Sequence, residues 1–208
     1  MRKIQLILLL VVLTFGCSPK TFNIKWTKEI APENYVARFE TSKGNFEIAV
    51  ERRLSPNAAD RFYQLVKHNY FDNSLFYRVN PGFVAQFGGN DSIAYKKWNS
   101  VKVPDEQVKQ SNSKGTFSFA RGGKDTRTSD LFINLGNNSR LDTIFYNDVR
   151  GFPSFGKVTN GMEVVEKLYS GYSDTTMDHF DLMMTNRDEF LKKFPELDVI
   201  EKAYLIEN

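Results

Sequence analysis

Apolar and polar residues alternate along the first part of the chain that carries a regular pattern. Residues 35–51, "YVARFETSKGNFEIAVE", form two alternating runs on either side of Ser42-Lys43-Gly44-Asn45. Alternation places successive side chains on opposite faces of a strand, and a short polar turn between two runs is typical of a β-hairpin. In the second run, Phe46, Ile48 and Val50 share one face, which we expect to be buried.

Six further short apolar runs each predict a strand. They read "SLFYRV", "FVAQFGG", "GTFSFARGG", "DLFINL", "FPSFGKV" and "VIEKAYLI". The first two are separated by Asn80-Pro81-Gly82, residues that favour a turn.

Helical spacing is clearest in residues 54–69, "LSPNAADRFYQLVKHN". Ser55 suits the N-cap and Pro56 suits the first helical position. His68 falls near the C-terminal end of this helix, where we expect it at the surface. The residues that form its apolar stripe are Ala59, Phe62, Leu65 and Val66.

Shorter helices are expected at "MEVVEKLYS" and at "RDEFLKKFPEL", the second stopped by Pro195. Residues 90–110, which include Trp98, are polar and predict a solvated loop. Many short strands with only two or three helices favour a mainly antiparallel sheet closed into a barrel. We therefore assign residues 34–172 to the barrel and residues 173–208 to a C-terminal extension with a helix and a final strand.

The N-terminus has the pattern of a targeting segment. "MRKIQLILLLVVLTFGC" begins with basic residues and continues with an apolar stretch from Ile4 to Phe15. As a helix, this stretch would be about 18 Å long, too short for a hydrocarbon core of about 30 Å. It fits the apolar region of a secretory signal, and "LTFGC" resembles a bacterial lipobox. The resemblance implies that residues 1–16 are a lipoprotein signal peptide, cleaved before a lipidated Cys17.

The residues that follow Cys17 suggest where such a lipoprotein would be found. Residues 17–33 show no clear period and contain two prolines, so we interpret them as a tether. Ser18 is not the aspartate that retains some lipoproteins at the inner membrane, so we expect an outer-membrane anchor facing the periplasm. The alternative is an ordinary signal peptide with an incidental thiol.

Charge and composition exclude several other classes of function. The chain has 208 residues, 41% of them hydrophobic, and a formal charge of +3. No basic stripe suggests a nucleic-acid partner. Because Cys17 is the only cysteine, an intramolecular disulfide is impossible. The two histidines show no convincing metal spacing, and we expect a monomer with no metal and no cofactor.

Arg78 is a permanent cation within the apolar stretch "LFYRVNPGFVAQFGGN". Three segments in order, "FYRVNPGFVAQFGG", "GTFSFARGG…SDLFINL" and "FPSFGKVTNGMEVVEKL", resemble the cyclophilin signature. The resemblance covers about residues 36–170. It implies a mainly β fold, a closed eight-stranded antiparallel barrel capped by two helices, with peptidyl-prolyl cis–trans isomerase activity on proline-containing segments of exported proteins.

The family resemblance also implies the site. Arg78 and Gln86 would be the catalytic residues, with Arg78 donating to the prolyl nitrogen when the amide twists. Asp130 departs from the family's glutamine, and it would either orient Arg78 or compete for it. The substrate-binding residues implied by the resemblance are Phe83, Val84, Ala120, Arg121, Phe132, Phe152, and Tyr146-Asn147 in the place of a Trp-Leu pair.

Two other functions remain open on the sequence. One is a peptide-binding or chaperone module with the same barrel and weak or no catalysis. The other is a different lipid-anchored barrel that binds carbohydrate or lipid. In the last case we expect Arg78 in a buried salt bridge away from any groove.

Overall fold

The alternating residues near the N-terminus form the first hairpin of the fold. The computed structural model describes residues 22–89 and 92–206. In it, β1 (Asn34–Thr41) pairs with β2 (Gly44–Glu51), as the turn residues predict. Phe39 and Phe46 face each other across the hairpin and stack with 4.9 Å between ring centroids. Ile48 and Val50 are buried on the same face, so the predicted apolar face is the core face.

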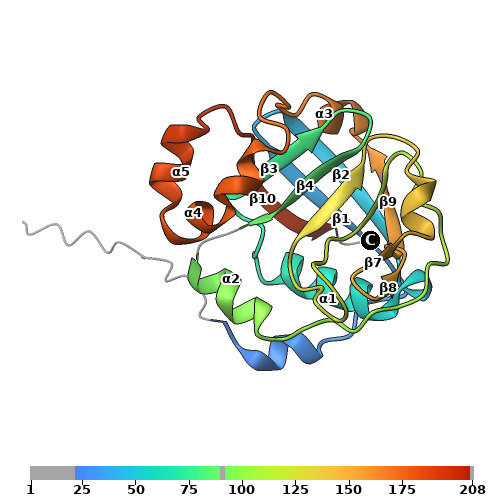
Figure 1. Ribbon diagram of the computed structural model, residues 1–208. Helices are drawn as coiled ribbons and strands as arrows, with labels where there is room; N and C mark the ends of the chain where they lie inside the picture. The colour runs from blue at the N-terminus through green and yellow to red at the C-terminus, as the bar shows by residue number, and fades with distance from the viewer. Residues whose placement is uncertain (1–21, 90–91, 207–208) are drawn as a thin grey trace, which may run out of the picture.

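The strands close into an antiparallel barrel in the order β1-β10-β3-β4-β6-β5-β9-β2 (Figure 1). This confirms the predicted fold class. The strands after the first hairpin are β3 (Ser74–Asn80), β4 (Val84–Gly89), β5 (Thr116–Phe119), β6 (Leu131–Asn134), β9 (Ser154–Asn160) and β10 (Val199–Ile206). A separate hairpin, β7 (Phe145–Tyr146) with β8 (Val149–Arg150), lies outside the barrel.

The barrel boundary predicted at residue 172 is wrong. β10 belongs to the segment 173–208, and it pairs with both β1 and β3. The C-terminal segment therefore supplies the strand that closes the barrel. Its other part forms η4 (Thr175–His179), α4 (Phe180–Thr185) and α5 (Arg187–Lys193) on the outside of β3 (Figure 1).

α1 (Pro56–Lys67) and α3 (Met162–Glu166) lie at opposite ends of the barrel (Figure 1). The predicted stripe of α1 is buried, and Pro56 is its first residue. Ser55 occupies the N-cap position, but its side chain does not cap the helix. The Glu106 carboxylate does so instead, because it accepts hydrogen bonds from the backbone N–H groups of Asn57 (2.9 Å) and Ala58 (3.2 Å).

The described part of the expected tether is packed against the body of the protein. η1 (Ile24–Lys28) places Trp26 flat on the ring of His68 at the end of α1, so His68 is not the surface residue we expected. Phe22 contacts Trp98 edge-on, with 5.0 Å between ring centroids. Residues 1–21, including Cys17 and the signal segment, lie outside the described residues.

The predicted solvated loop at 90–110 is wrong in part. Residues Ser92–Asn99 form α2, and Trp98 is only 3% exposed because it packs among Phe22, Trp26 and Tyr70. The remaining short helices are η2 (Arg52–Leu54) and η3 (Ser139–Asp142). Within the described ranges, every helix is too short or too polar to cross a membrane.

Candidate active site

A β-bulge in β3 directs Arg78 toward the outer face of the barrel. Phe76 and Val79 both belong to the main core, although they are three residues apart. The pairing with β4 shifts register between Phe76 and Arg78, and this shift breaks the strict alternation. The side chains of Tyr77 and Arg78 therefore both lie outside the main core, and Tyr77 is buried in a second hydrophobic cluster. Bulges of this kind re-aim a side chain beside many active sites.

The register then places three side chains in one row across the sheet. Arg78 on β3 is opposite Gln86 on β4, and Gln86 is opposite Phe132 on β6. Cross-strand partners share a face, so the three residues lie side by side. The Nη1 of Arg78 donates to the Oε1 of Gln86 at 3.2 Å. The Nε of Arg78 donates to the Oδ1 of Asp174 at 2.6 Å.

A pocket of about 320 Å³ opens beside this row. Its buried floor consists of Val84, Phe132 and Leu141. The ring of Phe152 meets that of Phe132 edge-on, with 5.9 Å between centroids. The lining residues are Arg78, Phe83, Val84, Gln86, Ala120, Arg121, Phe132, Leu141, Tyr146, Phe152 and Met177. The wall is thus mainly apolar, with two arginines and one amide at its edges.

Arg121 is a buried cation in the wall of this pocket. Its guanidinium carbon lies 4.1 Å from the centroid of the Phe152 ring, and its Nη2 donates to the carbonyl of Val149 at 3.0 Å. Burial lowers the pKa of Arg121, and the nearby charge of Asp105 opposes that shift. Arg121 joins the β7–β8 hairpin to the pocket and gives it a polar edge.

Comparison with known proteins identifies the family. Residues 36–186 match the family model described as cyclophilin type peptidyl-prolyl cis-trans isomerase/CLD. The chain belongs to the cyclophilin-type isomerases. It is therefore a peptidyl-prolyl cis–trans isomerase of this type, an assignment that its relatives support.

Two bacterial relatives illustrate the similarity of this cyclophilin to other isomerases. It is 34% identical over 137 residues to a peptidyl-prolyl cis-trans isomerase of Acinetobacter baylyi, covering 65% of this chain and 72% of the relative. It is 38% identical over 130 residues to peptidyl-prolyl cis-trans isomerase A of Dickeya dadantii, covering 62% and 67% respectively.

A solved cyclophilin-type isomerase of Cryptosporidium parvum supports the fold. It superposes with a TM-score of 0.60 at 20% identity, covering 84% of this chain and 99% of the other.

The structure brings nine of the ten residues implied by the resemblance to the lining of one pocket. The tenth, Asn147, lies outside that lining. It is in the turn between β7 and β8, where its φ is +44°, and its side chain donates to the carbonyl of Gly122 at 2.6 Å. Asn147 therefore supports the loop after β5 and does not line the pocket.

Of the pair Tyr146-Asn147, which we expected in the place of the family's Trp-Leu, only Tyr146 lines the pocket. Leu141 supplies the buried pocket leucine, and Arg140 before it lies over the Phe83 ring at 4.7 Å. The β7–β8 hairpin lies between Leu141 and Phe152 in the chain and carries Asn147 away from the pocket. Sequence reasoning also missed Met177 and Asp174, because both come from a segment that showed no motif.

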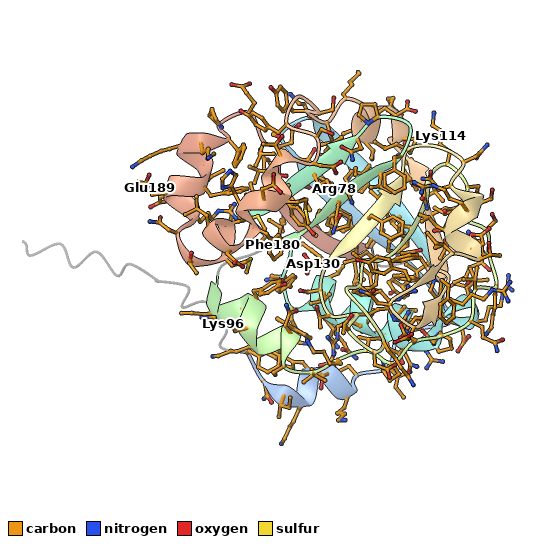
Figure 2. The ribbon with its side chains drawn as sticks, in the orientation of Figure 1. Arg78, Lys96, Lys114, Asp130, Phe180 and Glu189 are labelled. Carbon is orange, nitrogen blue, oxygen red and sulfur yellow. The ribbon has the colours of Figure 1, made fainter. Side chains whose placement is uncertain are left out.

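Asp130 does not have the role that its position suggested. Its carboxylate accepts a hydrogen bond from the hydroxyl of Tyr77 at 2.9 Å, and the carboxylate that contacts Arg78 is that of Asp174. Burial raises the pKa of Asp130 to about 6, while hydrogen bonds from Tyr77 and Tyr95 act in the opposite direction. Asp130 and these tyrosines form a polar group beside α2, beneath Phe180 (Figure 2).

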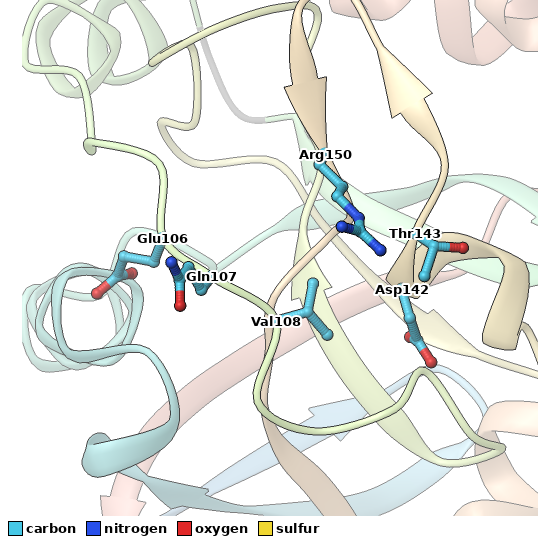
Figure 3. Close-up of a pocket in the computed structure, with 6 residues that line it drawn as sticks. All are labelled: Glu106, Gln107, Val108, Asp142, Thr143 and Arg150. Carbon is cyan, nitrogen blue, oxygen red and sulfur yellow. The ribbon is translucent and has the colours of Figure 1, made fainter.

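A second, more polar cavity of about 590 Å³ is shown in Figure 3, and it includes Asp142, the residue after Leu141 of the first pocket. Its lining residues are Glu106, Gln107, Val108, Asp142, Thr143 and Arg150. Both carboxylates already support the frame: Glu106 caps α1, and Asp142 accepts from the backbone N–H of Asn112 at 2.8 Å. Among the described residues, no group of three His, Cys, Asp or Glu side chains is arranged to hold a metal ion.

Proposed function

We propose that this cyclophilin accelerates X–Pro isomerisation during the folding of exported proteins, with Arg78 as the catalytic donor. The observation that carries the proposal is the position of Arg78, whose side chain is 24% exposed, at the edge of a mainly apolar pocket. An aromatic and aliphatic pocket of this size suits a proline ring. Gln86 and the pocket wall would then fix the ring beside the charge.

The chemistry requires little more than a fixed donor. Amide resonance gives a barrier of about 18–20 kcal/mol to rotation. At the twisted transition state conjugation is lost, and the prolyl nitrogen becomes a hydrogen-bond acceptor. A guanidinium that donates to this nitrogen binds the transition state more strongly than the planar ground states, which lowers the barrier. Each 1.4 kcal/mol or so of this preference increases the rate about tenfold.

The test is NMR exchange spectroscopy on an Ala-Pro peptide with the wild type, Arg78→Ala and a control, Arg53→Ala. Arg53 has a 74% exposed side chain, and its side-chain partner within the described part of the chain is Glu51. We expect Arg78→Ala to lower kcat/KM at least about a hundredfold and Arg53→Ala to leave it unchanged. Full activity in Arg78→Ala would rule out this mechanism.

A second candidate function is peptide binding with little catalysis. It is favoured by the contact between Arg78 and Asp174, because a carboxylate on the guanidinium could compete with substrate. This function predicts that peptide binds with the same affinity to the wild type and to Arg78→Ala, while neither accelerates exchange. The third possibility, a barrel with Arg78 buried away from any groove, conflicts with its place in the pocket lining.

We further propose that the protein is a lipoprotein of the bacterial cell envelope, anchored through Cys17 to the outer membrane and facing the periplasm. The support is the signal-like segment before Cys17. Four residues lie between Cys17 and Phe22, where the packed arm begins, so Cys17 is at most about 18 Å from Phe22 along the chain. Mass spectrometry of the protein from membranes tests this proposal, since an unmodified thiol would contradict it.

A further inference from the structure

We infer that Asp174 is a positioning residue for Arg78, an inference that rests on the catalytic role proposed for this arginine. Asp174 lies 96 positions after Arg78 in the chain, just before η4. Its Oδ1 accepts from the Nε of Arg78 at 2.6 Å and from the Nδ2 of Asn80 at 2.9 Å. One carboxylate oxygen thus joins the catalytic arginine to a neighbour on the same strand.

The segment that carries Asp174 is docked at the bulge of β3. The hydroxyl of Thr176 donates to the carbonyl of Tyr77, and Thr176 is 1% exposed. Ser173 adds a hydrogen bond from its hydroxyl to the Oδ1 of Asn80 at 2.6 Å. Phe180 meets the Tyr77 ring edge-on, with 5.5 Å between centroids. Asp174 is therefore held in place on both sides by contacts to β3.

The two contacts of Arg78 use opposite parts of its guanidinium. Asp174 accepts from Nε, and Gln86 accepts from Nη1. An arginine has five N–H donors in a planar fork, so these two contacts fix the plane and leave three donors for a substrate. The same segment also brings Met177 to the wall of the pocket. The hydrogen bond from Asn80 and then that from Arg78 lower the pKa of Asp174, so it stays charged at neutral pH.

In this arrangement Asp174 can orient Arg78 without occupying the N–H groups that a substrate would use. A substrate acceptor that approached Nη1 or Nη2 would not displace the Asp174 carboxylate from Nε. Removal of the carboxylate would leave the long Arg78 side chain free to rotate about its terminal bonds. Because a fixed donor acts mainly at the transition state, the loss should appear in kcat more than in KM.

The test compares Asp174→Ala and Asp174→Asn with Asp178→Ala, a matched control in η4. We expect Asp174→Ala to lower kcat about tenfold with KM changed less than about twofold. Asp174→Asn retains an acceptor oxygen and should recover part of the loss. Asp178→Ala should match the wild type. Urea unfolding of each variant checks that the fold is intact.

A double-mutant cycle and an NMR signal test whether Asp174 acts through Arg78. In an Arg78→Ala background, Asp174→Ala should have no further effect on kcat, because its action passes through Arg78. The Arg78 Nε–H resonance should be visible in the wild type and lost by solvent exchange in Asp174→Ala.

Two outcomes would overturn the inference while leaving the role of Arg78 intact. One is unchanged kcat in Asp174→Ala when Arg78→Ala is inactive. The other is increased kcat in Asp174→Ala, which would identify Asp174 as a competitor. Full activity in Arg78→Ala itself would instead reject the proposed function.

Discussion

Trp26 lies flat on the ring of His68, with 3.9 Å between ring centroids and 8° between the ring planes. This stack attaches the N-terminal arm to the C-terminal end of α1. Gln64 adds a hydrogen bond from its side chain to the carbonyl of Glu29 at 2.7 Å. The arm is therefore part of the folded body from Phe22 onward, although its sequence shows no regular pattern.

We predict that Trp26→Ala detaches the arm and lowers the free energy of unfolding by about 1–3 kcal/mol. The substitution removes the stack on His68 and the contact with Trp98. Trp98 then remains as the single tryptophan, and its fluorescence reports urea unfolding. Limited proteolysis should cut Trp26→Ala within residues 22–33 faster than the wild type. Equal cleavage rates would show that the stack does not hold the arm.

The second prediction concerns Glu106, which caps α1 and pairs with a buried cation. Arg127 is 0% exposed, and its Nη2 lies 3.0 Å from the Oε2 of Glu106. Glu106→Ala removes the cap and leaves a buried charge with less compensation, so we expect a loss of about 3–5 kcal/mol. The control is Glu51→Ala, which breaks the exposed pair with Arg53 and should cost less than about 1 kcal/mol. Similar losses in chemical denaturation would contradict this difference.

The third prediction is a pH dependence caused by Asp130. Burial raises its pKa to about 6, above the value of about 3.9 in an unfolded chain. The folded state therefore binds this proton more tightly, so the stabilisation is complete below about pH 4 and is lost as pH rises through about 6. We expect a contribution of about 1–3 kcal/mol.

The measurement for Asp130 is the free energy of unfolding at pH 4 and at pH 7 in the wild type and in Asp130→Asn. Other carboxyl groups, such as Asp174 with its lowered pKa, respond in the opposite direction in both proteins. The difference between the two proteins therefore isolates Asp130. We expect the wild type to lose stability relative to Asp130→Asn between pH 4 and pH 7. A relative gain in the free energy of unfolding would contradict the prediction.

The fourth prediction tests which residue forms the pocket floor. Leu141 is 6% exposed and lines the pocket, whereas Asn147 lies in the β7–β8 turn. Leu141→Ala should raise KM for an Ala-Pro peptide about threefold to thirtyfold, through the loss of apolar contact. Asn147→Ala should change KM less than about twofold. If Asn147→Ala has the larger effect, while both variants unfold at similar urea concentrations, the pocket assignment is wrong.

The sequence predicts the barrel and most of the pocket for identifiable physical reasons. Alternation in residues 35–51 sets the β1–β2 register, and the stripe of α1 sets its buried face. Such signals depend on residues that are near one another in the chain. Residues 75–90 and 116–134 likewise carry local motifs, so they locate the walls of the pocket.

Three features depended on information that local patterns do not contain. The bulge at Tyr77 arises from pairing between strands, and the run "SLFYRV" looks like any other strand. The β7–β8 hairpin separates Leu141 from Phe152 in the chain, although both side chains line the same pocket. Asp174 meets Arg78 only after a polar segment folds back across the outside of the barrel.

The pairing of β1 with β10 also determines when the molecule can finish folding. The first strand starts at Asn34 and its partner ends at Ile206. Contacts so distant along the chain form slowly, and a nascent polypeptide released early would expose an unpaired edge on β1. The closing strand and Asp174 both follow the other barrel strands in the chain, so they are synthesised after the rest of the barrel. A chain terminated before Asp174 would thus lack both the strand that closes the barrel and the carboxylate that contacts Arg78.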